Sequence, residues 1–128
     1  MIRWIEDKEN NRVYREDIRV SNQGNIFKST RFDGPYWCLS ISGPEKAKIN
    51  DDVQFVVSVI NWKGEDEAYK EPVDVNITIY RDGKIEKEMT ITVQDKATFT
   101  IPVEHTGNYT IRATYQDWKE GAWALTIE

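Results

Sequence analysis

The stretch PVDVNITIYRDGK, residues 72–84, decides the fold class of this 128-residue chain. Valine or isoleucine stands at every second position from residue 73 to residue 79, with the polar residues Asp74, Asn76 and Thr78 between them. This period of two is typical of a β-strand with one buried and one exposed face. The strand ends at Asp82-Gly83, a dipeptide that readily adopts the positive φ angles of a tight hairpin turn. The stretch therefore predicts one strand of an antiparallel sheet, with its partner directly after the turn.

The same alternation recurs along the chain from about residue 36. No window shows the three- and four-residue apolar spacing of an amphipathic helix, so we expect little or no helix. The alternating runs number about seven and are separated by Gly, Pro, Asn and Asp, which is typical of an antiparallel β-sandwich. The expected strands are centred on residues 39–41, 53–59, 73–79, 89–93, 99–103, 109–115 and 123–127.

The first 35 residues differ from the rest. RVYREDIRVSNQGNIFKSTRF, residues 12–32, suggests a hairpin that turns around Asn22–Asn25, and MIRWI, residues 1–5, suggests a further short strand or an arm. We therefore divide the chain into an N-terminal arm or hairpin, residues 1–35, and a sandwich, residues 36–128. The arm either covers an edge of its own sandwich or docks on a neighbouring subunit.

Three stretches carry a family resemblance. Residues 101–115, IPVEHTGNYTIRATY, resemble the E-to-F strand region of bacterial immunoglobulin-like domains. Residues 75–93, VNITIYRDGKIEKEMTITV, are similar to the central hairpin of that family, and residues 39–61, LSISGPEKAKINDDVQFVVSVIN, to its first two strands. The resemblance covers about residues 36–128 and implies an all-β, immunoglobulin-like antiparallel sandwich.

The resemblance also assigns structural roles to single residues. Tyr109 stands where the family has its tyrosine corner, two residues after Gly107, and Gly83 lies in the turn of the central hairpin. Ile111 stands where antibody-type domains have a cysteine, and Cys38 is the only cysteine in the chain, so no intrachain disulfide can form. The match is therefore to the disulfide-free branch found in bacterial surface proteins, polysaccharide-handling enzymes and tailed-phage particles.

Charge and hydropathy exclude some partners. With 17 basic and 22 acidic residues the net charge is −5, which disfavours nucleic acid as a partner because phosphates need a basic surface. No apolar stretch approaches the roughly 18 residues of a membrane span, so we expect no membrane partner. The opening MIRWIEDKEN lacks the apolar run of a secretory signal, so we expect no signal peptide in this chain.

The sequence predicts no enzyme and no cofactor. His105 is the only histidine, it falls in the expected E–F turn, and no nucleotide-binding or nucleophile-elbow motif is present. Loop carboxylates give weak calcium candidates, since calcium prefers several loop oxygens, but they lack a defined spacing and also fit a simply solvated charge. These candidates are Asp51, Asp52, Glu65 and Asp66, the last two followed by Glu67.

Aromatic residues in two loops are the candidate binding residues. The fold brings the B–C loop, residues 61–71, and the F–G loop, residues 116–121, to one end of the sandwich. We therefore expect Trp62, Tyr69 and Trp118 to lie near each other. They either cap the open end of the sandwich or contact a partner.

The first function hypothesis is a non-catalytic structural or adhesion protein, specifically a virion component such as a phage capsid or tail accessory protein. Its protein partner, or further copies of the chain, would bind through residues 1–35. The alternative is a carbohydrate-binding or cell-surface module that holds a glycan with its loop aromatics. Both hypotheses imply a virion or an extracellular surface as the location.

Overall fold

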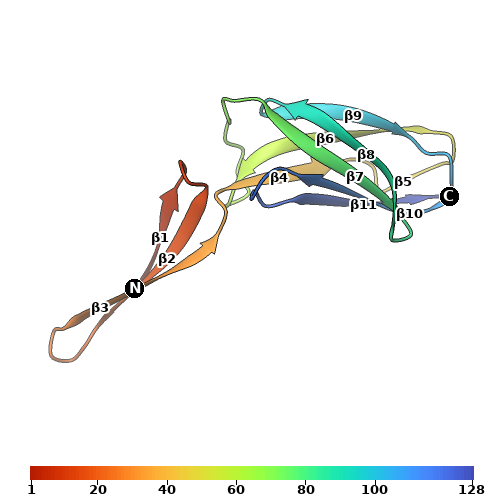
Figure 1. Ribbon diagram of the computed structural model, residues 1–128. Coiled ribbons are helices and arrows are strands. Elements are labelled where there is room, and N and C mark those ends of the chain that lie inside the picture. Colours follow the sequence, from red (N-terminus) through yellow and green to blue (C-terminus); the bar gives the residue numbers. More distant parts are fainter.

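The computed structural model describes all 128 residues and consists of strands, turns and loops without a helix (Figure 1). The N-terminal sheet has the order β1-β2-β3, from strands β1 (Ile2–Asp7), β2 (Arg12–Val20) and β3 (Ile26–Gly34). One sandwich sheet has the order β4-β6-β9, from β4 (Trp37–Ser42), β6 (Asp52–Asn61) and β9 (Lys96–Pro102). The other has the order β5-β11-β10-β7-β8, from β5 (Lys46–Ala47), β7 (Val73–Arg81), β8 (Lys84–Val93), β10 (Gly107–Thr114) and β11 (Gly121–Ile127).

The fold class is confirmed: residues 36–128 form an immunoglobulin-like sandwich. Its two sheets face each other (Figure 1), and the alternating buried residues of β6, β7 and β10 form the hydrophobic core together with those of the other strands. Phe55 and Phe99 stack there on neighbouring strands with their ring centroids 5.4 Å apart. Most of the long strands, such as β7, have polar residues on their outer face, which is why the sequence alternates so regularly.

Seven of the eight sandwich strands were expected, and the additional strand is β5. It has two residues and pairs in parallel with the end of β11, Lys46 with Thr126 and Ala47 with Ile127. The chain leaves the β4-β6-β9 sheet after Ser42 and joins the opposite sheet at Lys46. A strand of two residues is too short to show a period, so the alternation gave no sign of it.

The end of the sandwich near the C-terminus is fixed by short polar contacts. The Tyr109 hydroxyl donates a hydrogen bond to the backbone oxygen of His105 at 2.8 Å, as in a tyrosine corner. Asp82 and Gly83 both have positive φ, 51° and 85°, and form the turn between β7 and β8. An added Cβ at Gly107 would lie 2.9 Å from a carboxylate oxygen of Asp82, so this position favours glycine.

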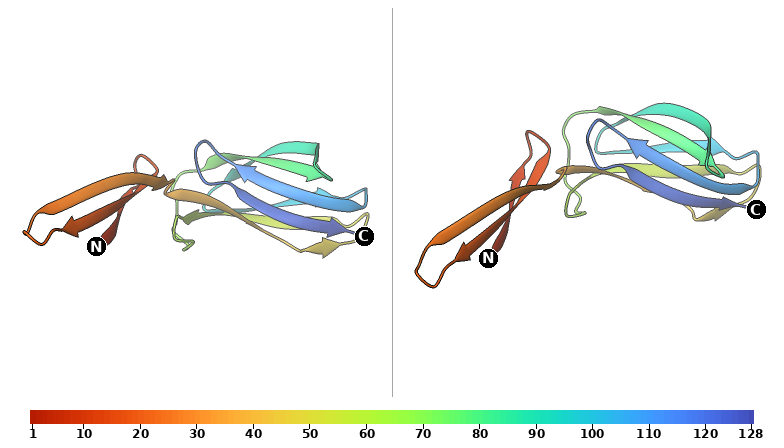
Figure 2. Two further views of the ribbon diagram at one scale, coloured as in Figure 1. Left: turned by 90° about the horizontal axis from the view of Figure 1, so that it is seen from below. Right: turned by 60° about the horizontal axis from the view of Figure 1, so that its bottom comes forward.

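The N-terminal sheet projects from the opposite end of the sandwich (Figures 1 and 2). The turn between β1 and β2 lies beside the sandwich, and the turn between β2 and β3 is the part of the sheet farthest from it. No helix with the length and apolar character needed to cross a membrane occurs in the structure.

Candidate functional site

A carboxylate in the β6–β7 loop anchors the N-terminal sheet to the sandwich. Glu67 accepts hydrogen bonds from Lys8 Nζ at 2.6 Å, from the Tyr36 hydroxyl at 2.6 Å and from Asn61 Nδ2 at 3.2 Å. The bonds from Lys8 and Tyr36 lower the pKa of Glu67 from 4.5 to about 2. The bond to Glu67 raises the pKa of Lys8, and burial followed by the same carboxylate raises the pKa of Tyr36.

A buried asparagine at the end of the β1–β2 turn makes the second anchor. Asn11 has a positive φ of 55°, and its side-chain oxygen accepts the backbone N–H of Trp37 at 2.5 Å. Its side-chain nitrogen donates to Asp117 in the β10–β11 loop at 3.3 Å. One side chain thus ties the turn to the first strand of the sandwich and to a loop of the other sheet.

Apolar and charged contacts complete this junction. Val13, at the start of β2, is buried within the hydrophobic core of the sandwich. Trp4 of β1 packs on Trp62 with ring centroids 5.5 Å apart, and Glu6 lies 3.5 Å from Lys63. The base of the N-terminal sheet is therefore packed on the sandwich and not merely linked to it by the chain.

Loop aromatics cap the sandwich beside the junction. The Trp118 ring lies 6.1 Å from that of Trp37, 5.0 Å from Tyr69 and 4.9 Å from Tyr115, and only 8% of Trp118 is exposed. Tyr69 and Trp118 lie together, as expected. Trp62 is not part of this group, because its ring packs on Trp4 of the N-terminal sheet. This contact joins residues 58 positions apart and could not be predicted from the local pattern.

An open groove runs between the aromatic cap and the β1–β2 turn. It is lined by Asn10, Trp37, Tyr69, Gln116, Asp117 and Trp118, among others. The groove has a volume of about 440 Å³. Its lining combines aromatic rings with amide and carboxylate groups. The packing of the loop aromatics and the contacts of Asn11 fix the positions of these lining residues.

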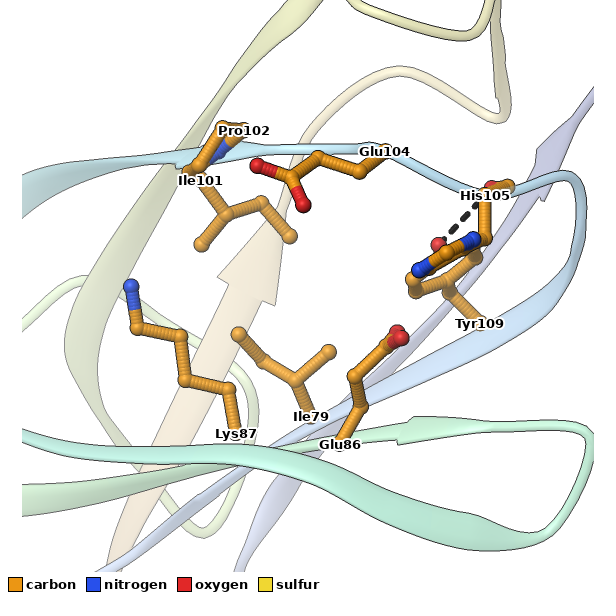
Figure 3. Close-up of a pocket in the computed structure, with 8 residues that line it drawn as sticks. All are labelled: Ile79, Glu86, Lys87, Ile101, Pro102, Glu104, His105 and Tyr109. Carbon is orange, nitrogen blue, oxygen red and sulfur yellow. Dashed lines mark hydrogen bonds between the residues drawn. The ribbon is translucent and has the colours of Figure 1, made fainter.

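A second cavity, of about 190 Å³, lies at the opposite end of the sandwich (Figure 3). Glu86 and Lys87 of β8 stand on one side, Glu104 and His105 on the other, with isoleucines from β7 and β9 between them. Glu86 forms an ion pair with Arg81 at 3.1 Å. Burial, followed by the charge of Glu86, raises the pKa of the neighbouring Tyr109.

The calcium candidates do not come together. Asp51 and Asp52 lie at the start of β6, whereas Glu65 and Asp66 follow its end, so the ten-residue strand separates the pairs. The Asp51 carboxylate accepts the backbone N–H of Lys48 at 2.9 Å, and Asp66 lies 3.8 Å from Lys96. No group of three or more His, Cys, Asp or Glu side chains is arranged to hold a metal ion.

The N-terminal sheet has two distinct faces, which the pairing of its strands defines. The inner face includes Trp4, Val13, Arg15, Phe27 and Arg31, and it leans on the sandwich at its base. The outer face carries six apolar residues from its three strands: Ile5, Tyr14, Ile18, Val20, Ile26 and Phe32. The difference between the two faces could not be predicted from the sequence, because apolar residues fall on both faces of β3.

The outer face has little cover. Val20 is 67% exposed, Ile26 65% and Phe32 58%. Its polar centre is an ion pair between Arg3 Nε and Glu16 at 2.9 Å, in which the carboxylate is buried. The N-terminal sheet lies within residues 1–35, the segment that the sequence analysis expected to bind a partner, and it is the most exposed apolar surface of the molecule.

Comparisons with known proteins find distant structural likenesses. No protein-family model and no curated protein matches the chain. Among solved structures, a Pyrococcus furiosus CARDB domain in complex with di-metal ions is 19% identical, with 72% of this chain and 87% of that chain covered and a TM-score of 0.47. The PKD domain of an M14-like peptidase from a Thermoplasmatales archaeon is 15% identical, with 70% and 92% covered and a TM-score of 0.47.

A superoxide reductase from Ignicoccus hospitalis is 17% identical, with 71% of this chain and 80% of that chain covered and a TM-score of 0.49. At such identities the comparisons speak to the fold alone. They include CARDB and PKD domains, which are immunoglobulin-like all-β folds. The closer resemblance to bacterial immunoglobulin-like domains stays a prediction.

The Glu67 anchor predicts a specific dependence of stability on pH. The pKa of Glu67 is lower in the folded chain than the ordinary 4.5, so its contribution is complete above about pH 5. It is lost as the pH falls through about 2, when the carboxylate is protonated. We expect Glu67→Gln to be less stable than the wild type above pH 5, with the difference shrinking between pH 4.5 and pH 2.

Urea unfolding followed by tryptophan fluorescence at several pH values measures this difference. Glu65→Gln, a change at an exposed neighbour in the same loop, is the matched control and should show little difference at any pH. A difference for Glu67→Gln that does not vary with pH would contradict the assignment.

Proposed function

We propose that this chain is a non-catalytic structural or adhesion module that binds a protein neighbour through its N-terminal sheet. One observation carries the proposal: a sheet whose outer face exposes apolar side chains beside the charged Arg3, Arg12 and Lys28 is anchored at its base and projects from a closed sandwich. Exposed apolar residues gathered among polar ones mark protein interaction sites. The sandwich supplies the rigid support.

The specific setting we propose is a virion, where the chain would be an accessory protein of a phage capsid or tail. The resemblance to the disulfide-free branch of bacterial immunoglobulin-like domains suggests this setting. An anchored docking element fits it because subunits of a particle must hold fixed orientations relative to their neighbours.

A density gradient tests this proposal. A phage-producing culture expresses either the wild-type chain or a double variant, and its particles are then separated on the gradient. The double variant combines Val20→Lys and Phe27→Lys, which place one charge on each face of the N-terminal sheet. Mass spectrometry of the gradient fractions should find the wild-type chain in the band of phage particles. The double variant should remain with free protein at the top of the gradient. A wild-type chain that stays at the top would overturn the virion setting.

The groove beside the aromatic cap supports a second candidate function, glycan binding. Amide and carboxylate groups next to aromatic rings are suited to sugar hydroxyls and the apolar faces of sugar rings. Gln116→Gly, which removes the side-chain amide from the groove and tolerates the positive φ of 46° at this position, should then reduce retention on a glycan array without lowering the melting temperature. Equal retention of the variant and the wild type would remove this candidate.

A further inference from the structure

Two arginines stand side by side on the inner face of the N-terminal sheet without a partner for their charges. Arg15 of β2 and Arg31 of β3 are direct cross-strand neighbours. We propose that they bind a carboxylate group carried by an extended segment of the protein neighbour, which pairs with the free edge of β3. This deepens the proposed function by naming the chemistry of the partner, and it rests on that function.

The strand register fixes the two guanidinium groups beside each other. Directly opposite residues in an antiparallel pair have Cβ atoms about 5 Å apart, and like charges in such a pair destabilise the sheet. Trp4 of β1 is the neighbour of Arg15 on its other side, so one row runs from Trp4 through Arg15 to Arg31. The Arg15 Cζ lies 5.9 Å from the centroid of the Trp4 ring, a contact that favours this position of the guanidinium.

Neither arginine has a carboxylate partner within the chain. The ion pairs of the structure include neither Arg15 nor Arg31. The Nε of Arg15 is buried and has no hydrogen-bond partner. A buried donor without an acceptor is costly, and a charged one more so. A carboxylate bound at this guanidinium would supply both the acceptor oxygens and the opposite charge.

The carboxylates of the same face do not fill this role. Asp17 pairs with Arg19 at 3.4 Å, and Glu6 lies 3.5 Å from a lysine of the sandwich. Asp33, farther along β3, is exposed and forms no ion pair. The charges of the two arginines therefore remain uncompensated.

A hollow of about 310 Å³ opens at the arginine pair. Its lining contains no hydrophobic residue and consists of Arg15, Asp17, Ser29, Thr30 and Arg31. The planar fork of an arginine matches a carboxylate through two parallel N–H···O bonds, and a serine hydroxyl can donate a further one. The hollow is therefore suited to a small anionic group and not to an apolar one.

The free edge of β3 favours a protein segment as the source of the carboxylate. β3 is an outer strand of the N-terminal sheet and pairs only with β2 (Figure 1). Backbone groups along an unpaired edge can accept a further strand. Such a strand would place every second side chain on the inner face, and the one opposite Arg31 would extend the row of Trp4, Arg15 and Arg31. An aspartate or glutamate there would reach the arginine pair.

Fluorescence anisotropy of a labelled peptide that alternates threonine and glutamate tests the proposal with the full chain. The wild type should bind the peptide saturably. Arg31→Gln should raise the dissociation constant by about tenfold or more, because it removes a hydrogen bond between two charged groups.

Lys28→Gln is the matched control. It removes the same charge from the same strand, and both side chains are exposed, but Lys28 lies on the outer face. This variant should bind the peptide like the wild type, and neither variant should have a lower melting temperature. A wild-type chain that does not bind the peptide, or an equal loss of affinity in both variants, overturns the proposal.

Changes in the probe test the carboxylate and the strand pairing separately. Glutamine in place of each glutamate should abolish binding, and so should N-methylation of each peptide residue, which removes the backbone donors. Oligogalacturonate carries carboxylates without a peptide backbone and should bind more weakly than the acidic peptide. Binding of any of these three probes as tight as that of the acidic peptide would contradict the proposal.

The Arg15 side chain gives a local readout. Its Nε–H signal in NMR spectra should shift during titration with the acidic peptide. The corresponding signal of Arg12, which lies on the outer face, should stay in place. Equal shifts of the two signals would exclude the inner-face site.

This proposal and the proposed function fail in different ways. A chain that bands with particles but does not bind the acidic peptide would end the arginine site and leave the docking function in place. A chain that binds the peptide through Arg31 but never bands with particles would support the site and end the virion setting.

Discussion

Replacing Trp118 with alanine is expected to lower the free energy of unfolding by about 3–5 kcal/mol, the range for truncating a buried aromatic side chain. Trp118 lies in a loop, but it is 8% exposed and its ring packs on those of Trp37, Tyr69 and Tyr115. For a domain of this size the loss corresponds to a melting temperature lower by about 10–20 °C. Thermal unfolding followed by circular dichroism measures it.

This experiment also decides between capping and partner contact for the loop aromatics. Trp62→Ala is the comparison, because Trp62 is only partly buried and its ring partner is Trp4 of the N-terminal sheet. We expect it to cost less than half as much stability as Trp118→Ala. If Trp118→Ala melted like the wild type, Trp118 would not be a capping residue and its role in ligand contact would become the better explanation.

The second large effect is expected at Asn11. Asn11→Ala removes the acceptor for the buried N–H of Trp37 and places alanine at a φ of 55°. An unsatisfied buried donor costs about 1–3 kcal/mol, and a left-handed backbone costs a non-glycine residue about 1 kcal/mol more. We therefore expect a loss of about 2–4 kcal/mol in urea unfolding.

Asn11→Gly separates the two causes, because glycine tolerates the backbone angle but also lacks the side-chain acceptor. It should recover about 1 kcal/mol of the loss and no more. Hydrogen exchange adds a local readout: the Trp37 amide should exchange faster in both variants. An unchanged Trp37 amide would contradict the anchoring role of Asn11.

Local patterns predicted the sandwich because its strands alternate over long runs. The residues 73–79 alternate without an exception, and the Asp82-Gly83 turn follows at once, so both the strand and its hairpin could be foreseen. Tyr109 was placed through its neighbours in the E–F stretch, and its hydroxyl does bond to the backbone four residues earlier. Such features depend on residues close in sequence.

The junction could not be foreseen in this way. Asn11 contacts Asp117 across 106 positions, and Lys8 contacts Glu67 across 59. An asparagine in a polar turn and a glutamate in an acidic loop have the same appearance in sequence whether they are solvated or buried in a contact. Trp62 was grouped with Tyr69 and Trp118 because all three lie in loops at one end of the sandwich. Its aromatic partner, Trp4, lies in residues 1–35, which the family resemblance does not cover.

The anchored base of the N-terminal sheet also bears on the entropy of binding. Only residues 35–36 join this sheet to the sandwich covalently, so without the contacts at its base the sheet would sample many orientations. Binding by such a sheet would have to restrict that freedom, which weakens association. Here the restriction takes place when the chain folds, so a partner meets a preorganised surface and each contact it makes contributes more fully to affinity.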